Sequence, residues 1–269
     1  LNYTIMTLNI FENKKYAKMA IKLSKNYLNQ KPFPSIQIKN FLPINLAKQI
    51  YEEYPNYHEK KIWINYNNKN AMNKKSCQDE RLFPLKIRNL FRELNSRQFI
   101  LFLETLTGID GLIPDPYFMG GGIHIAKSEG FLKKHIDFNW HHKLQAFRRV
   151  NVLIYLTPNW KKSYGGELEL SSGKNKISHL PIFNSCVVFN TSDKSFHGHP
   201  QPLKINQNIF RRVLNIYYYT TSRNKKEIFN PTFTNYNKFI KKEKLNKKLF
   251  DIKNSPWSMS LKDNYLKLK

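Results

Sequence analysis

The second half of the chain is a series of short apolar runs with no helical segment between them. The runs are rich in Val, Ile, Tyr and Phe, and Gly, Pro, Asn and Ser separate them. They read GGGIHIA, FLKKHIDF, RVNVLIYL, GELELSS, NSCVVFN and RVLNIYYYT. Strands that follow one another without long crossover connections pair antiparallel. The sequence therefore predicts an antiparallel sandwich or barrel over residues 111–221.

Residues 1–110 are predicted to form a helix-rich support region of the same domain. Apolar side chains recur at helical spacing in three stretches, residues 11–30, 42–55 and 81–107. The third stretch is interrupted near Asn95 and Ser96, and residues 35–42 alternate as a strand does. Residues 63–79 are rich in Asn and Lys without clear periodicity, which indicates a loop.

The chain is strongly basic, with a formal net charge of +26 at pH 7. Clustered Lys and Arg suit a polyanionic partner. Lys, Asn and Ile are abundant throughout, however, and such a composition also arises without selection for binding. Thirteen basic and four acidic residues lie between Arg223 and Lys269, so residues 222–269 are predicted to form a basic helical C-terminal extension. A solvated tail is the simpler interpretation, and a nucleic-acid contact is the alternative.

Size and composition favour one large globular domain, since the chain has 269 residues, of which 41% are hydrophobic. Cys77 and Cys186 lie far apart and match no metal or redox spacing, so no disulfide framework is expected. No apolar run approaches the roughly 18 residues of a membrane span. The first residues also lack the apolar core of a secretory signal. A reducing, cytoplasmic location is the resulting expectation.

The stretch FLKKHIDFNW places a histidine and an aspartate two positions apart in a predicted strand. Side chains alternate along a strand, so His135 and Asp137 point to the same face. An imidazole and a carboxylate on one face are two of the three ligands of the facial triad that binds Fe(II). Such a pair alone more often means two exposed polar residues, so a third ligand is required. SFHGHPQPL supplies two candidates, His197 and His199.

Two arginines open the next predicted strand, FRRVLNIYYYT. An arginine in a core strand is unfavourable unless its guanidinium has a partner, and the planar guanidinium suits a carboxylate. Alternation puts Arg211 and Arg212 on opposite faces, so only one of them points inward. The order His-x-Asp, then His, then Arg is much more specific than any one of its parts.

This order of motifs resembles the iron(II)- and 2-oxoglutarate-dependent dioxygenases, in particular their prolyl-hydroxylase-like branch. The resemblance extends over most of residues 33–221. It implies an α+β fold with a mainly β core, a double-stranded β-helix or cupin-like jelly roll. It rests on the stretches PFPSIQIKNFLPINLAKQIYEEYP, GGGIHIAKSEGFLKKHIDFNWHH, RRVNVLIYLTPNWKKSYGGELEL, SFHGHPQPL and FRRVLNIYYYT.

Carried over residue by residue, the resemblance makes His135, Asp137 and His197 the iron ligands. His197 is preferred because the family's distal ligand follows the loop after a VVFN-like strand, as His197 does here. The sequence HGHP keeps His199 as the alternative.

The resemblance also implies a binding site for the co-substrate 2-oxoglutarate. Arg211 would hold its far carboxylate, because the distance from Arg211 to YYYT matches the family pattern better than that of Arg212. Tyr155, in LIYL, resembles the family's tyrosine that donates a hydrogen bond to the same carboxylate; a plain core tyrosine is the alternative. His124, in GGGIHIA, is a candidate to line the co-substrate pocket, against a packed core histidine.

The activity that the resemblance implies is hydroxylation. Such an enzyme uses Fe(II), 2-oxoglutarate and O2, with ascorbate in support, hydroxylates an unactivated C–H bond, and releases succinate and CO2. A prolyl or other side chain of a protein or peptide is the expected substrate. The alternatives are a related oxygenase acting on a nucleic acid or an anionic small molecule, and a jelly-roll binding module without catalysis. No HExxH motif supports a zinc hydrolase.

Overall fold

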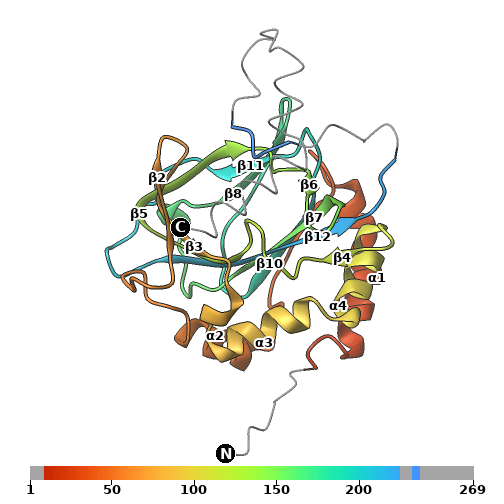
Figure 1. The fold of residues 1–269 in the computed structure, drawn as a ribbon, viewed down its shortest axis with the longest axis horizontal. Helices are drawn as coiled ribbons and strands as arrows, with labels where there is room; N and C mark the ends of the chain where they lie inside the picture. Colours follow the sequence, from red (N-terminus) through yellow and green to blue (C-terminus); the bar gives the residue numbers. More distant parts are fainter. Residues whose placement is uncertain (1–8, 225–231, 237–269) are drawn as a thin grey trace, which may run out of the picture.

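One antiparallel sheet, curled into a barrel-like jelly roll, forms the centre of the molecule (Figure 1). The computed structural model describes residues 9–224 and 232–236, so most of the predicted extension over residues 222–269 lies outside the described residues. Eight strands neighbour one another in the order β1 (Ser35–Ile38), β10 (Ser185–Asn190), β7 (Ala146–Tyr155), β12 (Arg211–Thr220), β5 (Gly122–His135), β11 (Phe196–His199), β8 (Leu168–Ser172) and β9 (Asn175–His179). These strands all pair antiparallel, which confirms the predicted fold class.

The apolar runs of the sequence form the middle of this sheet because both of its faces are covered. In β7, Val152 and Ile154 face the helical side, while Leu153 and Tyr155 face the interior of the jelly roll. A strand buried on both faces has a continuous apolar run rather than an alternating one. Two short strands, β4 (Ile113–Pro114) and β6 (Trp140–His141), pair with β12 and β7.

A polar hairpin, β2 (Ile64–Asn68) and β3 (Ala71–Cys77), joins the sheet by pairing β3 with β5. The prediction of a loop over residues 63–79 is therefore wrong. β2 is almost wholly exposed and carries no apolar alternation, so backbone pairing holds it rather than burial. The close approach of β3 depends on Gly122, which has a φ of 87° and at which a Cβ would lie 2.0 Å from the carbonyl oxygen of Cys77.

In the described residues, four α-helices lie on one side of the sheet, as the helical spacing predicts (Figure 1). They are α1 (Lys14–Asn29), α2 (Ile44–Glu52), α3 (Leu85–Leu94) and α4 (Arg97–Thr107), and two 3-10 turns span Glu80–Leu82 and Lys162–Tyr164. Ser96 separates α3 from α4 and caps α4, because its hydroxyl accepts from the backbone N–H of Phe99. None of the helices in the described residues is both long and apolar enough to span a bilayer.

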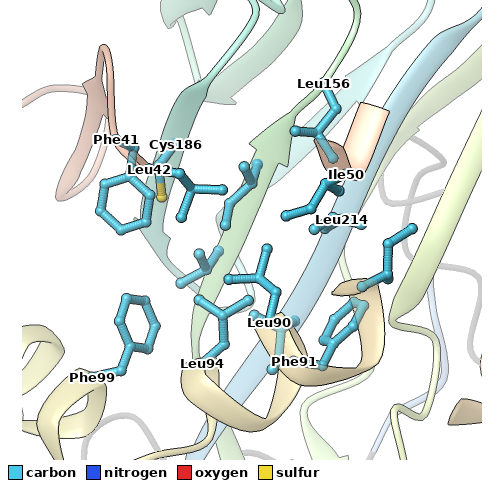
Figure 2. Packing of buried hydrophobic residues seen from close by; sticks show 14 of the residues in the cluster. Phe41, Leu42, Ile50, Leu90, Phe91, Leu94, Phe99, Leu156, Cys186 and Leu214 are labelled. Carbon is cyan, nitrogen blue, oxygen red and sulfur yellow. The ribbon is translucent and has the colours of Figure 1, made fainter. Parts of the chain in front are cut away.

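Helices and sheet meet in one large apolar core (Figure 2). Leu90 and Phe91 of α3 pack there with Leu214 of β12 and Cys186 of β10, and each is at most 1% exposed. Burial of one such apolar side chain is worth roughly 1.5–3 kcal/mol. Cys186 and Cys77 are buried free thiols, as expected without a disulfide framework. This core fixes the outer face of the sheet and leaves the inner face to line a cavity.

Candidate active site

Three side chains that are far apart in the sequence meet at one end of the jelly roll. His135 is the last residue of β5, and Asp137 lies two residues after it. His197 of β11 is directly opposite His135 in the sheet register. The possible ligand atoms of the three residues lie within 4.8 Å of one another. Asp137 Oδ1 is 3.4 Å from His135 Nε2, and Asp137 Oδ2 is 3.2 Å from His197 Nε2.

Backbone carbonyls orient both imidazoles toward this point. His135 Nδ1 lies 2.9 Å from the carbonyl oxygen of Lys133, and His197 Nδ1 lies 3.2 Å from that of Ser195. An Nδ1–H that donates to a carbonyl fixes the tautomer and leaves the Nε2 lone pair free to bind a metal. Two imidazoles and one carboxylate that converge in this way fit Fe(II).

Asp137 is held in place by two side chains of β7. The guanidinium of Arg148 is 2.8 Å from Asp137 Oδ2, and the amide of Asn151 donates to the same oxygen at 2.8 Å. Burial alone would raise the pKa of Asp137, but Arg148 and His197 hold this pKa well below its usual range. Arg148 is only 1% exposed, and its guanidinium lies 3.3 Å from the ring centre of Tyr217.

Sequence reasoning did not identify Arg148 or Asn151 as residues of the site. The signal is visible in RRVNVLIYL, where an arginine and an asparagine interrupt a strand that is otherwise apolar. A polar side chain in such a strand needs a buried partner. The partner, Asp137, is on another segment, so only the three-dimensional structure identifies it.

A cavity of about 180 Å³ begins at the side chains of His135, Asp137 and His197 and extends into the jelly roll. Lys74 of β3, His124 of β5, His199 of β11 and Arg211 of β12 all contribute to its wall. The cavity therefore collects several nitrogen-bearing side chains around the carboxylate of Asp137. Its cationic lining suits an anionic ligand.

Arg211 points into this cavity and Arg212 points away from it. Arg211 is 5% exposed, and its Nε–H donates to the carbonyl of Gly166 at 2.9 Å. Its terminal nitrogen lies 3.4 Å from the hydroxyl of Tyr155. Arg212 lies instead over the ring of Tyr51, 4.9 Å from its centre. Of the two arginines, the structure thus makes Arg211 available to a ligand in the cavity.

The remaining predicted residues take different positions around the cavity. His199 belongs to its wall but not to the group of three, whereas His197 does belong to that group. His124 lines the cavity and bonds to the carbonyl of Gly121 through Nε2 at 3.0 Å. Tyr155 lies behind Arg211 in an apolar cluster of the interior. Burial raises its pKa, so its hydroxyl stays protonated.

A short extended segment, residues 232–236, lies across the mouth of the cavity; we call it the strap. The backbone of Asn235 bonds in both directions to that of Ile136, at 2.9 and 2.8 Å. Thr234 and Tyr236, on either side of Asn235, line the cavity, and the ring centre of Tyr236 is 5.2 Å from that of His135. In Figure 1 the strap is the short blue segment between two grey traces. No pattern in the sequence indicates this contact.

Comparisons with known proteins agree with this geometry. Residues 121–219 match the family model described as the 2OG-Fe(II) oxygenase superfamily. No curated protein matches the chain significantly. Among solved structures, a prolyl hydroxylase from Trichoplax adhaerens, bound to a peptide fragment of the hypoxia inducible factor oxygen degradation domain, has a TM-score of 0.57 at 17% identity. This alignment covers 78% of the present chain and 92% of that chain.

Two further structures extend the likeness. A prolyl-4-hydroxylase from Pseudomonas putida has a TM-score of 0.55 at 15% identity, with 76% and 100% of the two chains covered. HygX from Streptomyces hygroscopicus, with nickel, 2-oxoglutarate and hygromycin B bound, has a TM-score of 0.51 at 8% identity, with 77% and 95% covered. At these identities the likeness establishes the fold. Together with the family match over residues 121–219 and the His-Asp-His group inside that region, it supports a non-haem iron dioxygenase that uses Fe(II), 2-oxoglutarate and O2.

Proposed function

We propose that this dioxygenase hydroxylates an unactivated C–H bond in a side chain of a protein or peptide, with proline as the first candidate. One oxygen atom of O2 enters the product, and the other enters the succinate that forms as 2-oxoglutarate loses CO2. The observation that carries the peptide part of the proposal is the pairing of Ile136 with an extended segment of polypeptide. Ile136 stands between the two residues His135 and Asp137, so a chain bound at this edge lies beside the reacting centre.

The roles of the side chains follow from their positions. His135, Asp137 and His197 would hold Fe(II), which when bound with 2-oxoglutarate supplies the activation of dioxygen. Arg211 would hold the far carboxylate of 2-oxoglutarate through its planar guanidinium. Arg148 keeps Asp137 ionised and oriented.

Recognition of an extended peptide at a strand edge uses main-chain hydrogen bonds for affinity and alternate side chains for specificity. The N–H and C=O of Ile136 form such an edge, and in the strap Thr234 and Tyr236 are the alternate side chains that reach the cavity. The Trichoplax adhaerens neighbour is described as a complex with a peptide fragment. We therefore propose that a substrate peptide takes the place of the strap along the segment that carries His135 and Asp137.

The test is a hydroxylation assay on a mixture of cellular peptides with Fe(II), 2-oxoglutarate and ascorbate. Mass spectrometry should find peptides that gain one oxygen atom with the native enzyme and not with Asp137→Ala. Succinate formation is measured in parallel. If the enzyme forms succinate but no peptide in a broad mixture gains oxygen, a protein or peptide is not the substrate, although the dioxygenase chemistry stands.

A further inference from the structure

The cavity contains a second cationic side chain that the family match does not cover. Lys74 belongs to β3, whereas the matched residues are 121–219. In the sheet register, Lys74 pairs with Ala126 of β5, and Ala126 pairs with Arg211 of β12 on its other side. Residues opposite one another on neighbouring strands point to the same face. Lys74 and Arg211 therefore extend from one row of the sheet, with only the small side chain of Ala126 between them.

Neither of these cations forms an ion pair within the part of the chain that the structure describes. Among the described residues, no carboxylate lies within ion-pair distance of Lys74 or Arg211, and the carboxylate of Asp137 in the same cavity is paired with Arg148. The Lys74 ammonium lies over the ring of Tyr66, 4.6 Å from the ring centre. Arg211 is buried and Lys74 is half-buried, so the two cations are partly desolvated and repel one another, which is costly unless an anion binds between them.

His199 adds a hydrogen-bonding group to the same place. It is 4% exposed, lines the cavity, and its Nδ1 has no hydrogen-bond partner among the described residues. An unpaired buried nitrogen is rare in a folded protein and indicates a missing partner.

We infer that Lys74 is a second cation for the far carboxylate of 2-oxoglutarate, and that His199 donates a hydrogen bond to the same group. Arg211, Lys74 and His199 then surround one carboxylate from three different strands, β12, β3 and β11. This assignment rests on the proposed role of Arg211 and is independent of the identity of the substrate. It gives the β2–β3 hairpin a part in binding the co-substrate.

The test is calorimetric titration of 2-oxoglutarate into the Fe(II)-loaded protein without oxygen, which measures binding and not turnover. Lys74→Met should weaken 2-oxoglutarate binding about tenfold or more, because a charge-assisted contact is lost. Lys74→Arg should restore most of the affinity. Binding of 2-oxopentanoate, which lacks the far carboxylate, should change less than about twofold in Lys74→Met, since the lost contact serves only that group.

Lys75→Met is the matched control, because Lys75 is on the same strand but bonds to the carbonyl of Tyr57 outside the cavity. It should leave 2-oxoglutarate binding unchanged. His199→Phe should weaken 2-oxoglutarate binding with the iron content retained. The inference is overturned if Lys74→Met binds 2-oxoglutarate as the native protein does, or loses affinity equally for both acids. If Arg211→Met also has no effect, the proposed role of Arg211 fails as well.

Discussion

Asp137 is buried beside two imidazoles and must nevertheless remain charged, although burial normally disfavours the charged form of a carboxyl group. The Arg148 guanidinium, 2.8 Å away, provides the compensating charge, and Asn151 provides a hydrogen bond from the same strand. Arg148 is in turn enclosed by the rings of Phe138 and Tyr217. The position of the carboxylate therefore depends on a cation that itself needs no contact with the metal.

Arg148→Met should lower the free energy of unfolding by about 3–5 kcal/mol, because it leaves a buried carboxylate without its ion-pair partner. Urea unfolding of the metal-free protein measures this loss. The double variant Arg148→Met/Asp137→Asn should lose clearly less than the sum of the two single variants, since the unpaired charge is gone. Additive losses would show that the pair is not coupled.

The pH dependence of 2-oxoglutarate binding should come from Lys74. Burial, and then Arg211, lowers the pKa of Lys74 to about 7. Below pH 7 the ammonium is charged and ready for the anion, whereas above pH 7 it is neutral in the free protein and must take up a proton on binding. Affinity should therefore fall as the pH rises from about 6 to 8. The same slope in Lys74→Met, measured calorimetrically, would contradict this assignment.

At the scale of elements, the strands that are buried on both faces could be predicted from the sequence, and the β2–β3 hairpin could not. β7, β10 and β12 are runs of Val, Ile and Tyr whose composition is enough to mark them as strands. β2 is polar and exposed, and its pairing is set by backbone hydrogen bonds. The hairpin nevertheless brings Lys74 to the cavity. Because the hairpin could not be predicted, the position of Lys74 could not be predicted either.

Gly122→Ala should displace β3 and weaken both stability and co-substrate binding. The new Cβ would lie 2.0 Å from the carbonyl oxygen of Cys77, at a φ of 87°. The melting temperature and the affinity for 2-oxoglutarate should both fall. Gly173→Ala is the control, because that φ is also positive, 58°, but no atom lies within 4 Å of the added Cβ. Equal effects of the two substitutions would mean that the approach of β3 to Gly122 does not matter.

Asn235→Pro should release the strap from the ligand-bearing segment. Proline has no N–H, so the bond to the carbonyl of Ile136 is lost. Hydrogen exchange at the amide of Ile136 should become faster, as measured by mass spectrometry. Asn235→Ala keeps the backbone N–H and should exchange as the native protein does. Unchanged exchange in Asn235→Pro would mean that the strap does not protect this edge.

At the scale of the whole molecule, the helices cover one face of the sheet, and the other face lines the cavity of the candidate active site. The order His-x-Asp, His, Arg predicted side chains that the structure brings together at one cavity, because β5, β11 and β12 are neighbours in the sheet. Contacts between distant segments could not be predicted in this way. Arg148 with Asp137 and Asn235 with Ile136 depend on how loops return to the sheet, and no local pattern encodes that return.

We expect His135, Asp137 and His197 to bind one Fe(II), while His199 belongs to the co-substrate end of the cavity. The most direct measurement is the iron content of His197→Ala and His199→Ala after anaerobic loading and gel filtration. The native protein and His199→Ala should retain about one Fe(II) per chain, and His197→Ala should lose it, because only His197 completes the group of three ligands. Retention of iron by His197→Ala together with its loss from His199→Ala would contradict the account.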